Sequence, residues 1–304
     1  MVDRGEDWRS AARGELLGLR SRPRGWGYRK GASPAVEPTC LACLGLLATR
    51  RPAGPESRDE AAAIVADAAD WLADVQRPDG SLGAAGASSG PGWPTPLGLL
   101  LWRACGGREG PRRRGVEWLL REQGESWTST THASPVLGHD PRIVGWPWVD
   151  GTHSWLEPTA TAVLALRAAG LGAHPRCVEG LRLILDRAIE AGGWNYGNKS
   201  AFGNALRPQP APTGLALLAL ARQNARTAIV DRAIRYLQEV LPGIRACSSL
   251  GWGLLGLRAW DSAPAEADRW LAEAFQHASG RPDAAPKLAL LLLAGGDHGT
   301  DLFE

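Results

Sequence analysis

The chain has 304 residues, of which 44% are hydrophobic and 22% are charged, a composition typical of a globular protein. Its formal net charge of +2 is too small to favour a nucleic-acid partner. No apolar run reaches the length of about 18 residues that spans a bilayer, and no signal-peptide pattern opens the chain, so a cytoplasmic location is expected. The five cysteines lack the spacing of a disulfide framework, and Cys40 and Cys43 are expected to fill the core rather than hold a metal.

The aromatic residues are unevenly distributed, with 14 tryptophans against 3 tyrosines and 3 phenylalanines. A buried tryptophan needs a partner for its indole N–H, so this excess requires an explanation that a generic core does not supply.

Six short apolar segments recur along the chain, and most of them begin with proline in the first helical turn. They cover residues 37–48, 95–102, 157–166, 211–221, 248–260 and 286–294. Proline is well placed in a first turn because its missing N–H would have no intrahelical partner there. Since these segments are apolar on nearly all sides, they predict buried helices.

Amphipathic segments alternate with the apolar ones. They cover residues 6–19, 60–76, 112–123, 176–191, 225–240 and 265–277. An apolar helix needs cover on every side, and an amphipathic helix can supply it. The alternation of six and six therefore predicts an all-α fold, an (α/α)6 toroid with an inner and an outer ring of helices. Residues 25–304 are expected to form one domain, preceded by a basic leader over residues 1–24 that contains the first outer helix.

Several turns carry a Gln-and-Trp pattern, as in "RRGVEWLLREQGESW" (113–127), alongside "DGSLG" (79–83) and "GGWNYGN" (192–198). With the repeated Pro-Thr helix starts, they resemble the repeats of the squalene–hopene cyclase and prenyltransferase superfamily, from about Gly25 to Ala294. The resemblance implies a toroid whose lumen binds an isoprenoid. In that superfamily the cyclases donate a proton from a D-x-D-D-T-A motif, and the protein prenyltransferases hold zinc.

Neither signature is intact in this chain. The segment "WLEPTA" (155–160) is the best match to D-x-D-D-T-A, and it places Glu157 at the position of the proton-donating aspartate. No inner helix begins with the acidic, cysteine and histidine pattern of the zinc enzymes, so no metal and no other cofactor is expected.

The loops that lead into the inner helices of a toroid all open at one end. Glu37 and Glu157 are therefore expected to converge on a single mouth, with Asp150 and His153 close to Glu157, and these four are the candidate catalytic residues. A structural reading stays open for both glutamates, because a carboxylate at a helix start stabilises the helix dipole and caps free N–H groups.

The residues around these helix starts are the candidates for substrate binding. An aromatic wall can hold an apolar ligand, stack against a sugar or stabilise a cation through its ring faces. The candidates are Trp26, Trp93, Trp146, Trp148, Trp155, Thr159, Trp194, Asn195, Tyr196 and Trp252.

Three functions remain open at this stage. The first is an isoprenoid-handling enzyme with Glu157 as proton donor, and the second is a non-catalytic toroid that binds a hydrophobic molecule or a partner protein. The third is a carbohydrate-active toroid that uses Glu37 and Glu157 as paired carboxylates. The expected partner is an isoprenoid-like hydrophobic small molecule, with membrane contact through the N-terminal arginines as a further alternative.

Overall fold

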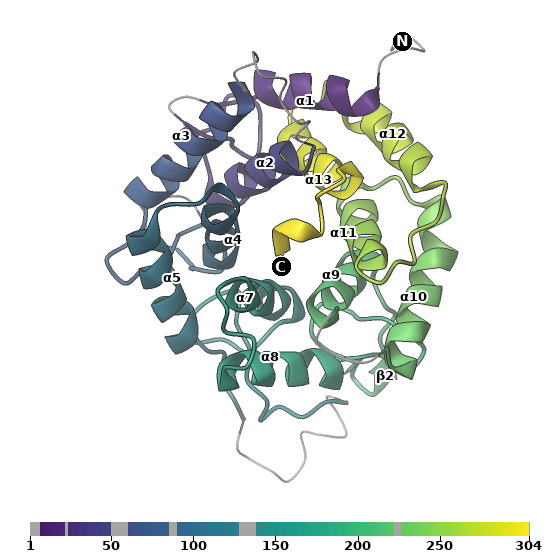
Figure 1. The fold of residues 1–304 in the computed structure, drawn as a ribbon. Coiled ribbons are helices and arrows are strands. Elements are labelled where there is room, and N and C mark those ends of the chain that lie inside the picture. Colours follow the sequence, from purple (N-terminus) through teal and green to yellow (C-terminus); the bar gives the residue numbers. More distant parts are fainter. Residues whose placement is uncertain are drawn as a thin grey trace.

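Two concentric rings of α-helices surround a central axis (Figure 1). The structure is a computed structural model that describes residues 7–21, 24–49, 60–84, 90–127, 138–221 and 226–303. The inner ring consists of α2 (Val36–Ala48), α4 (Thr95–Cys105), α7 (Leu156–Ala168), α9 (Pro210–Leu220), α11 (Cys247–Arg258) and α13 (Ala284–Gly295). The outer ring consists of α1 (Trp8–Gly18), α3 (Glu60–Asp74), α5 (Glu109–Arg121), α8 (Pro175–Asp186), α10 (Ala228–Val240) and α12 (Ala267–Ala278). The predicted (α/α)6 toroid is confirmed, with six inner and six outer helices in the described residues.

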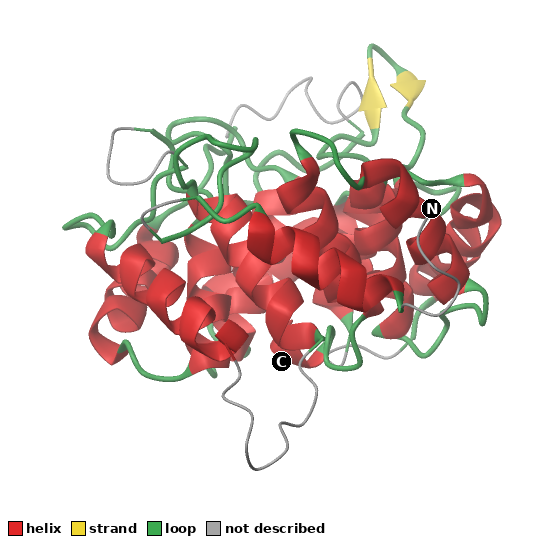
Figure 2. Cartoon of the chain, turned by 90° about the horizontal axis from the view of Figure 1, so that it is seen from above, coloured by secondary structure: helices red, strands yellow, loops and turns green. Residues whose placement is uncertain are grey.

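Short elements complete the fold. A small hairpin of two two-residue strands, β1 (Ser200–Ala201) and β2 (Asn204–Ala205), stands on the face where loops enter the inner helices (Figure 2). The 3₁₀ turn η1 (Leu241–Gly243) follows α10, and η2 (Asp301–Phe303) lies near the C-terminus.

The two rings differ in burial as the sequence pattern predicts. Every residue of α9 is buried, because this helix is covered by its inner neighbours and by the outer ring. In α10 the buried residues are spaced by three and four, and the other faces are exposed to solvent. They are Val230, Ala233, Ile234 and Leu237.

The inner ring closes between its first and last helices. A Cβ atom on Gly45 of α2 would lie 2.5 Å from the carbonyl oxygen of Ala289 in α13, so only glycine permits this approach of the two backbones. The outer ring closes beside it, where Trp8 Nε1 of α1 donates to Asp268 Oδ1 of α12 at 3.1 Å. Arg9 Nε of α1 also donates to the Gly295 carbonyl at the end of α13.

A repeated joint connects the two rings and accounts for three of the tryptophans. A Gly-Trp pair precedes α2, α7 and α9, and each tryptophan N–H donates to the threonine hydroxyl of the following Pro-Thr at 2.9–3.0 Å. The indole N–H of the same residue donates to a carbonyl near the end of the preceding outer helix, at 2.6–2.9 Å. The three pairs are Trp26 with Leu16, Trp146 with Leu119, and Trp194 with Ile184. One buried indole thus hydrogen-bonds both rings while its N–H is satisfied.

A fourth inner helix uses the same joint with a different residue. The Leu82 N–H donates to Thr95 Oγ1 at 2.8 Å, and Leu82 is fully buried like the tryptophans. Leucine lacks the indole N–H, so this joint makes the contact to the inner ring only.

The Gln that follows α3 hydrogen-bonds two nearby carbonyls. Gln76 Nε2 donates to the carbonyls of Gly80 and Pro111, at 2.9 and 2.8 Å. It therefore joins the turn after α3 to the first turn of α5.

Most of the N-terminal arginines in the described residues are paired within the chain. Arg9 forms an ion pair with Asp268, and Arg20 and Arg24 form ion pairs with the α3 residues Asp67 and Asp74. The start of the predicted first helix at Glu6, together with Arg4 and Arg22, lies outside the described residues. Within the part of the chain that the structure describes, no helix is long and apolar enough to cross a membrane.

Candidate functional site

The repeated joint fixes where the two candidate glutamates point. Thr39 faces outward, because its hydroxyl meets the Trp26 backbone between the two rings. Glu37 stands two residues earlier on the same helix, about 200° around its axis, and so faces the lumen. The same argument places Glu157 on the lumen side of α7, since Thr159 meets Trp146 in the same way. Both glutamates lie in the first turn of their helices, at the same end of the ring.

The Glu157 carboxyl is poorly solvated and unpaired. Burial, and then the like charge of Glu37, raises the pKa of Glu157 to about 7. Within the described residues, its side chain has no hydrogen-bond or ion-pair partner. At neutral pH a large share of this carboxyl is therefore protonated and able to give up a proton.

Glu37 has the same place on its helix but a different neighbour. Tyr28 Oη donates to Glu37 Oε2 at 2.6 Å. Burial raises the pKa of Glu37, and this hydrogen bond opposes the rise because it stabilises the carboxylate. The pKa of both carboxyls is thus raised, but only Glu37 has a hydrogen bond that stabilises its anion.

Tyr196 is placed at the mouth by α7 itself. The Leu156 N–H, at the start of α7, donates to the Tyr196 carbonyl at 2.9 Å. Burial raises the pKa of Tyr196, and the charge of Glu157 adds to the rise, so the phenol lies close to that carboxyl. Its side chain is 45% exposed, which leaves one face open to a ligand.

Sequence reasoning missed Tyr28, although a pattern in the chain identifies it. In the Gly-Trp turns before α2, α7 and α9, a second aromatic follows the tryptophan by two residues. These residues are Tyr28, Trp148 and Tyr196. The first aromatic of each turn is buried in the joint, and the second is exposed or half-buried. The spacing Gly-Trp-x-aromatic therefore separates framework residues from accessible ones.

Asp150 and His153 do not join Glu157, contrary to the sequence-based expectation. Asp150 borders a narrow crevice with Glu122 and Trp93, where burial and then the charge of Asp150 raise the pKa of Glu122 to about 7. His153 lines another pocket, and the charge that acts on it is that of Arg187. The reason is the course of the 145–155 loop, which runs over the rim before it enters α7.

Four residues that were expected to bind substrate belong to the joints instead. Trp26, Trp146 and Trp194 are 0–2% exposed, and Thr159 is fully buried. Their polar groups are hydrogen-bonded between the two rings. The structure therefore places them behind the mouth rather than at its surface.

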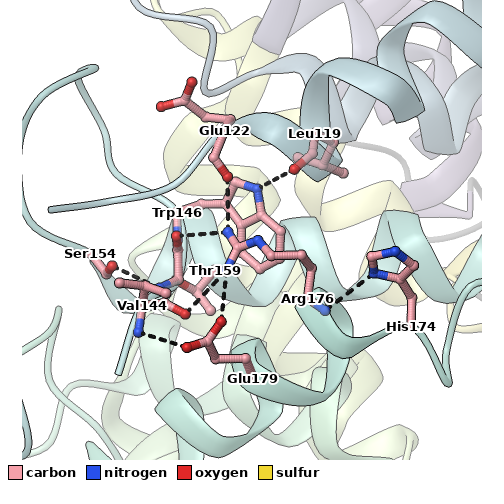
Figure 3. A network of polar contacts seen from close by, with 10 residues as sticks. Leu119, Glu122, Val144, Trp146, Ser154, Thr159, His174, Arg176 and Glu179 are labelled. Atoms are coloured by element: carbon pink, nitrogen blue, oxygen red, sulfur yellow. Dashed lines mark hydrogen bonds and ion pairs between the residues drawn. The ribbon is translucent and has the colours of Figure 1, made fainter. Parts of the chain in front are cut away.

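Figure 3 shows how firmly Trp146 is held. The Arg176 guanidinium lies over its ring, 4.2 Å from the centroid, and donates to the Glu122 carbonyl at 2.8 Å. The same guanidinium is paired with Glu179 at 3.1 Å. This network joins α8 to the end of α5 and to the loop before α7.

The other aromatic candidates lie along the rim. The half-buried Trp93 and Trp148 pack edge to face, with ring centroids 4.7 Å apart. Trp155 precedes α7 and packs against the ring of His153 at 4.6 Å. Asn195 Nδ2 donates to the Arg207 carbonyl at 2.6 Å, so its amide stabilises the turn that presents Tyr196.

The far end of the ring is occupied by the C-terminal segment, which returns to the centre of the ring (Figure 1). Phe303 of η2 is buried there, and its ring centroid lies 6.2 Å from that of Trp252 in α11. Trp252 thus faces the axis but contacts the chain's own tail. Figure 2 shows this end opposite the loops that lead into the inner helices.

No metal cluster forms in the described residues, since no three histidine, cysteine, aspartate or glutamate side chains gather in a way that could hold an ion. Cys40 and Cys43 are buried free thiols, and burial raises the pKa of both.

The arrangement defines a class: an (α/α)6 toroid with two carboxyls and two tyrosines at one end of its lumen. No family model and no curated protein matches the sequence. Among solved structures, the chain is similar to the type II terpene cyclase MstE from Scytonema, with 17% identity over 91% of this chain and 79% of that one, and a TM-score of 0.59. It is also similar to the glycoside hydrolase family 76 mannosidase Bt3792 from Bacteroides thetaiotaomicron, with 12% identity over 95% and 97% of the two chains and a TM-score of 0.58. A protein from Actinoplanes, 19% identical over 91% and 82%, has a TM-score of 0.57. These likenesses show the fold that the chain shares with toroid enzymes.

Proposed function

We propose that the mouth of the lumen is an acid–base site, in which Glu157 donates a proton to an apolar, isoprenoid-like small molecule. The observation that carries the proposal is the pair of carboxyls at this mouth, where Glu157 is unpaired with a pKa of about 7 and Glu37 is hydrogen-bonded by Tyr28. Two neighbouring carboxyls with different proton affinities are the usual arrangement for separate acid and base roles.

The surroundings favour an apolar substrate. The inner helices are mainly apolar in sequence, as in α9, where Thr213 is the one polar side chain between Pro210 and Leu220. The type II terpene cyclase is also a toroid, and its complex contains geranylgeranyl dihydroxybenzoate. An isoprenoid chain would enter among the mouth residues with its reacting double bond near Glu157.

The proposed reaction is an isomerisation or cyclisation. The proton of Glu157 forms a C–H bond with the π electrons of an alkene and leaves a carbocation. Ring faces of Tyr28 and Tyr196 stabilise the cation, as aromatic faces do for other cations. In an isomerisation, a C–H bond next to the cation loses its proton and a new C=C bond forms. In a cyclisation, a second C=C bond first attacks the cation, and the new cation then loses a proton in the same way. The released proton returns to a carboxylate of the pair, so atoms and charge balance.

The decisive experiment replaces Glu157 by glutamine, which keeps the shape and removes the proton. Turnover of a panel of polyprenols, prenyl diphosphates and squalene-like substrates is measured by mass spectrometry. We expect Glu157→Gln to lower kcat by about 10²–10⁴-fold with binding retained, the usual contribution of a general acid. Glu122→Gln is the matched control, because that carboxyl also has a pKa of about 7 but lies in the crevice beside Asp150. Full activity of Glu157→Gln on a turned-over substrate would remove Glu157 as the acid.

Glycoside hydrolysis is the second candidate, and it is favoured by the mannosidase likeness, which extends over 97% of that chain. Glycosidases use one protonated and one ionised carboxyl, separated by about 5–10 Å. Release of nitrophenol from aryl mannosides, lost in both Glu157→Gln and Glu37→Gln, would favour this activity over the first. A carboxyl separation outside that range in a liganded structure would exclude it.

A non-catalytic role is the remaining alternative, and the missing D-x-D-D motif fits it. Saturable binding of the same ligands by the wild type and by Glu157→Gln, without product from either, would replace the acid–base proposal by this one.

A further inference from the structure

A separate pocket lies on the rim of the toroid, away from the glutamate pair. It has a volume of about 160 Å³ and is bordered by the loop before α7 and by the turn after α8. His153 and Ser154 line it from the loop, and Arg187 and Asn198 line it from the turn. None of these residues has a role in the acid–base site.

Arg187 is a buried cation with incomplete neutralisation. Its residue is only 5% exposed, and Nη1 donates to the Gly197 carbonyl at 3.3 Å. Nε has no hydrogen-bond partner in the described residues, since Asp186 Oδ2 lies 3.6 Å away. Burial lowers the pKa of Arg187 to about 10, although the charges of Asp186 and Asp140 oppose the change. A desolvated guanidinium with unused donors is stabilised by an anion that can accept from them.

Two histidines also line the pocket. His139 is 7% exposed and borders it, as does His153. Burial lowers the pKa of His153, and the positive charge of Arg187 lowers it further. An anion beside Arg187 would offset that repulsion. Glu125 is the carboxylate on the lining, and it is exposed, whereas Arg187 is buried.

The remaining wall is apolar. It is formed by Trp127, Pro141 and Ile143, of which Ile143 is buried and Trp127 is 56% exposed. The pocket is too small for a drug-sized ligand, for which about 300 Å³ is the lower end. A cavity of about 150 Å³ holds benzene, so one ring and one small anionic group match the available space.

We propose that this Arg187 pocket binds a small organic carboxylate with a flat apolar body. The carboxylate lies against the Arg187 guanidinium, which donates a charge-assisted hydrogen bond to it, and the body packs on the apolar wall beside Trp127. The site is independent of the proposed chemistry at Glu157.

The test measures the binding of benzoate to the complete chain by isothermal titration calorimetry, with benzyl alcohol as a neutral analogue of the same shape. We expect saturable 1:1 binding of benzoate, and binding of benzyl alcohol weaker by about tenfold or more, because a charge-assisted hydrogen bond contributes about 1.5–3 kcal/mol. Arg187→Gln should weaken benzoate binding by about the same factor. Arg258→Gln is the matched control, since burial also lowers the pKa of Arg258, which donates to Gly296 and does not line the pocket.

A second variant covers the case in which Arg187→Gln does not fold. Trp127→Ala changes an exposed side chain, so the fold is retained, and loss of the apolar wall should weaken benzoate binding severalfold. Glu157→Gln should bind benzoate like the wild type, which separates a failure here from a failure at the mouth. Equal binding of benzyl alcohol, unchanged binding by folded Arg187→Gln, no binding by the wild type, or tighter binding of inorganic phosphate than of benzoate would each overturn the proposal.

Discussion

The starts of α2 and α7 are two copies of one design with different chemistry. Each has a Gly-Trp pair buried in the joint, a threonine that accepts from it, and a glutamate two residues before that threonine. At α2 the glutamate accepts a hydrogen bond from Tyr28, whereas at α7 the Glu157 carboxyl has no partner in the described residues. The joint therefore fixes where each carboxyl stands, and the neighbouring loop fixes how readily it gives up its proton.

Each of these two joints is held by several buried hydrogen bonds. At α7, for example, the Trp146 N–H donates to Thr159 and its indole N–H donates to Leu119. A Cβ atom on Gly145 would lie 2.3 Å from Thr159 Oγ1, so this glycine is required for the approach. These contacts are the same at α2, which makes the framework of the two sites comparable and leaves the loop neighbours as the variable.

Removing the indole of a joint tryptophan should disrupt the joint at either helix start and cause the largest loss of stability. We expect Trp26→Ala and Trp146→Ala each to lower the free energy of unfolding by about 3–5 kcal/mol, because a large cavity forms and buried hydrogen-bonding groups lose their partner. Urea unfolding followed by circular dichroism measures this change. Trp148→Ala is the matched control, since Trp148 is a half-buried rim residue, and its effect should be clearly smaller. A cost for Trp148→Ala equal to that for Trp146→Ala would contradict the division into framework and rim aromatics.

The pH dependence of stability should separate the two glutamates. Folding raises the pKa of Glu157 from 4.5 to about 7, so the native state binds more protons than the unfolded state between these pH values. Protonation of Glu157 therefore stabilises the native state, by up to about 3 kcal/mol. This stabilisation is fully present below about pH 4.5 and is lost as the pH rises through about 7. Relative to the wild type, Glu157→Gln should therefore gain stability as the pH is raised from about 4 to about 8.

Glu37→Gln is the comparison for this measurement. Its pKa is also raised, so the sign is the same, but the Tyr28 hydrogen bond opposes the rise and the gain should be smaller. Unfolding curves at a series of pH values give both differences. A larger pH-dependent gain for Glu37→Gln would reverse the assignment of the two carboxyls.

The sequence predicted the two rings because these depend on short-range patterns, and the catalytic roles of Glu37 and Glu157 stay predictions. Alternating apolar and amphipathic segments determine which helices lie inside. Because Glu157 stands two residues before the outward-facing Thr159, helical geometry turns it toward the lumen. The predicted outer helix 176–191 ends at Asp186 in the structure, because the chain turns at Arg187 toward the Gly192-Gly193 pair.

The roles of individual side chains depend on contacts between loops, which the sequence pattern alone does not contain. His153 is four residues from Glu157 in sequence, yet it contacts Trp155 and lines the Arg187 pocket. Trp146 and Trp148 are two residues apart and have opposite environments, one buried and one on the rim. The composition shows an excess of tryptophan, but only the packing of the two rings distinguishes framework tryptophans from surface tryptophans.

The smallest expected effect tests the difference between the two copies most directly. Tyr28→Phe removes the hydroxyl that donates to Glu37 Oε2 and leaves the ring in place. The pKa of Glu37 should rise further, because its anion loses a charge-assisted hydrogen bond. The pKa of Glu157 should fall by a smaller amount, because the charge of Glu37 that raises it is then partly neutralised at neutral pH. Carboxyl carbon shifts in a pH titration by NMR measure both values.

Tyr196→Phe is the matched control, since the Tyr196 hydroxyl makes no hydrogen bond in the described residues, and it should leave the pKa of Glu37 unchanged. If Tyr28→Phe leaves both carboxyls as they are, the hydrogen bond is not what distinguishes α2 from α7, and the difference must then lie in how deeply each carboxyl is desolvated.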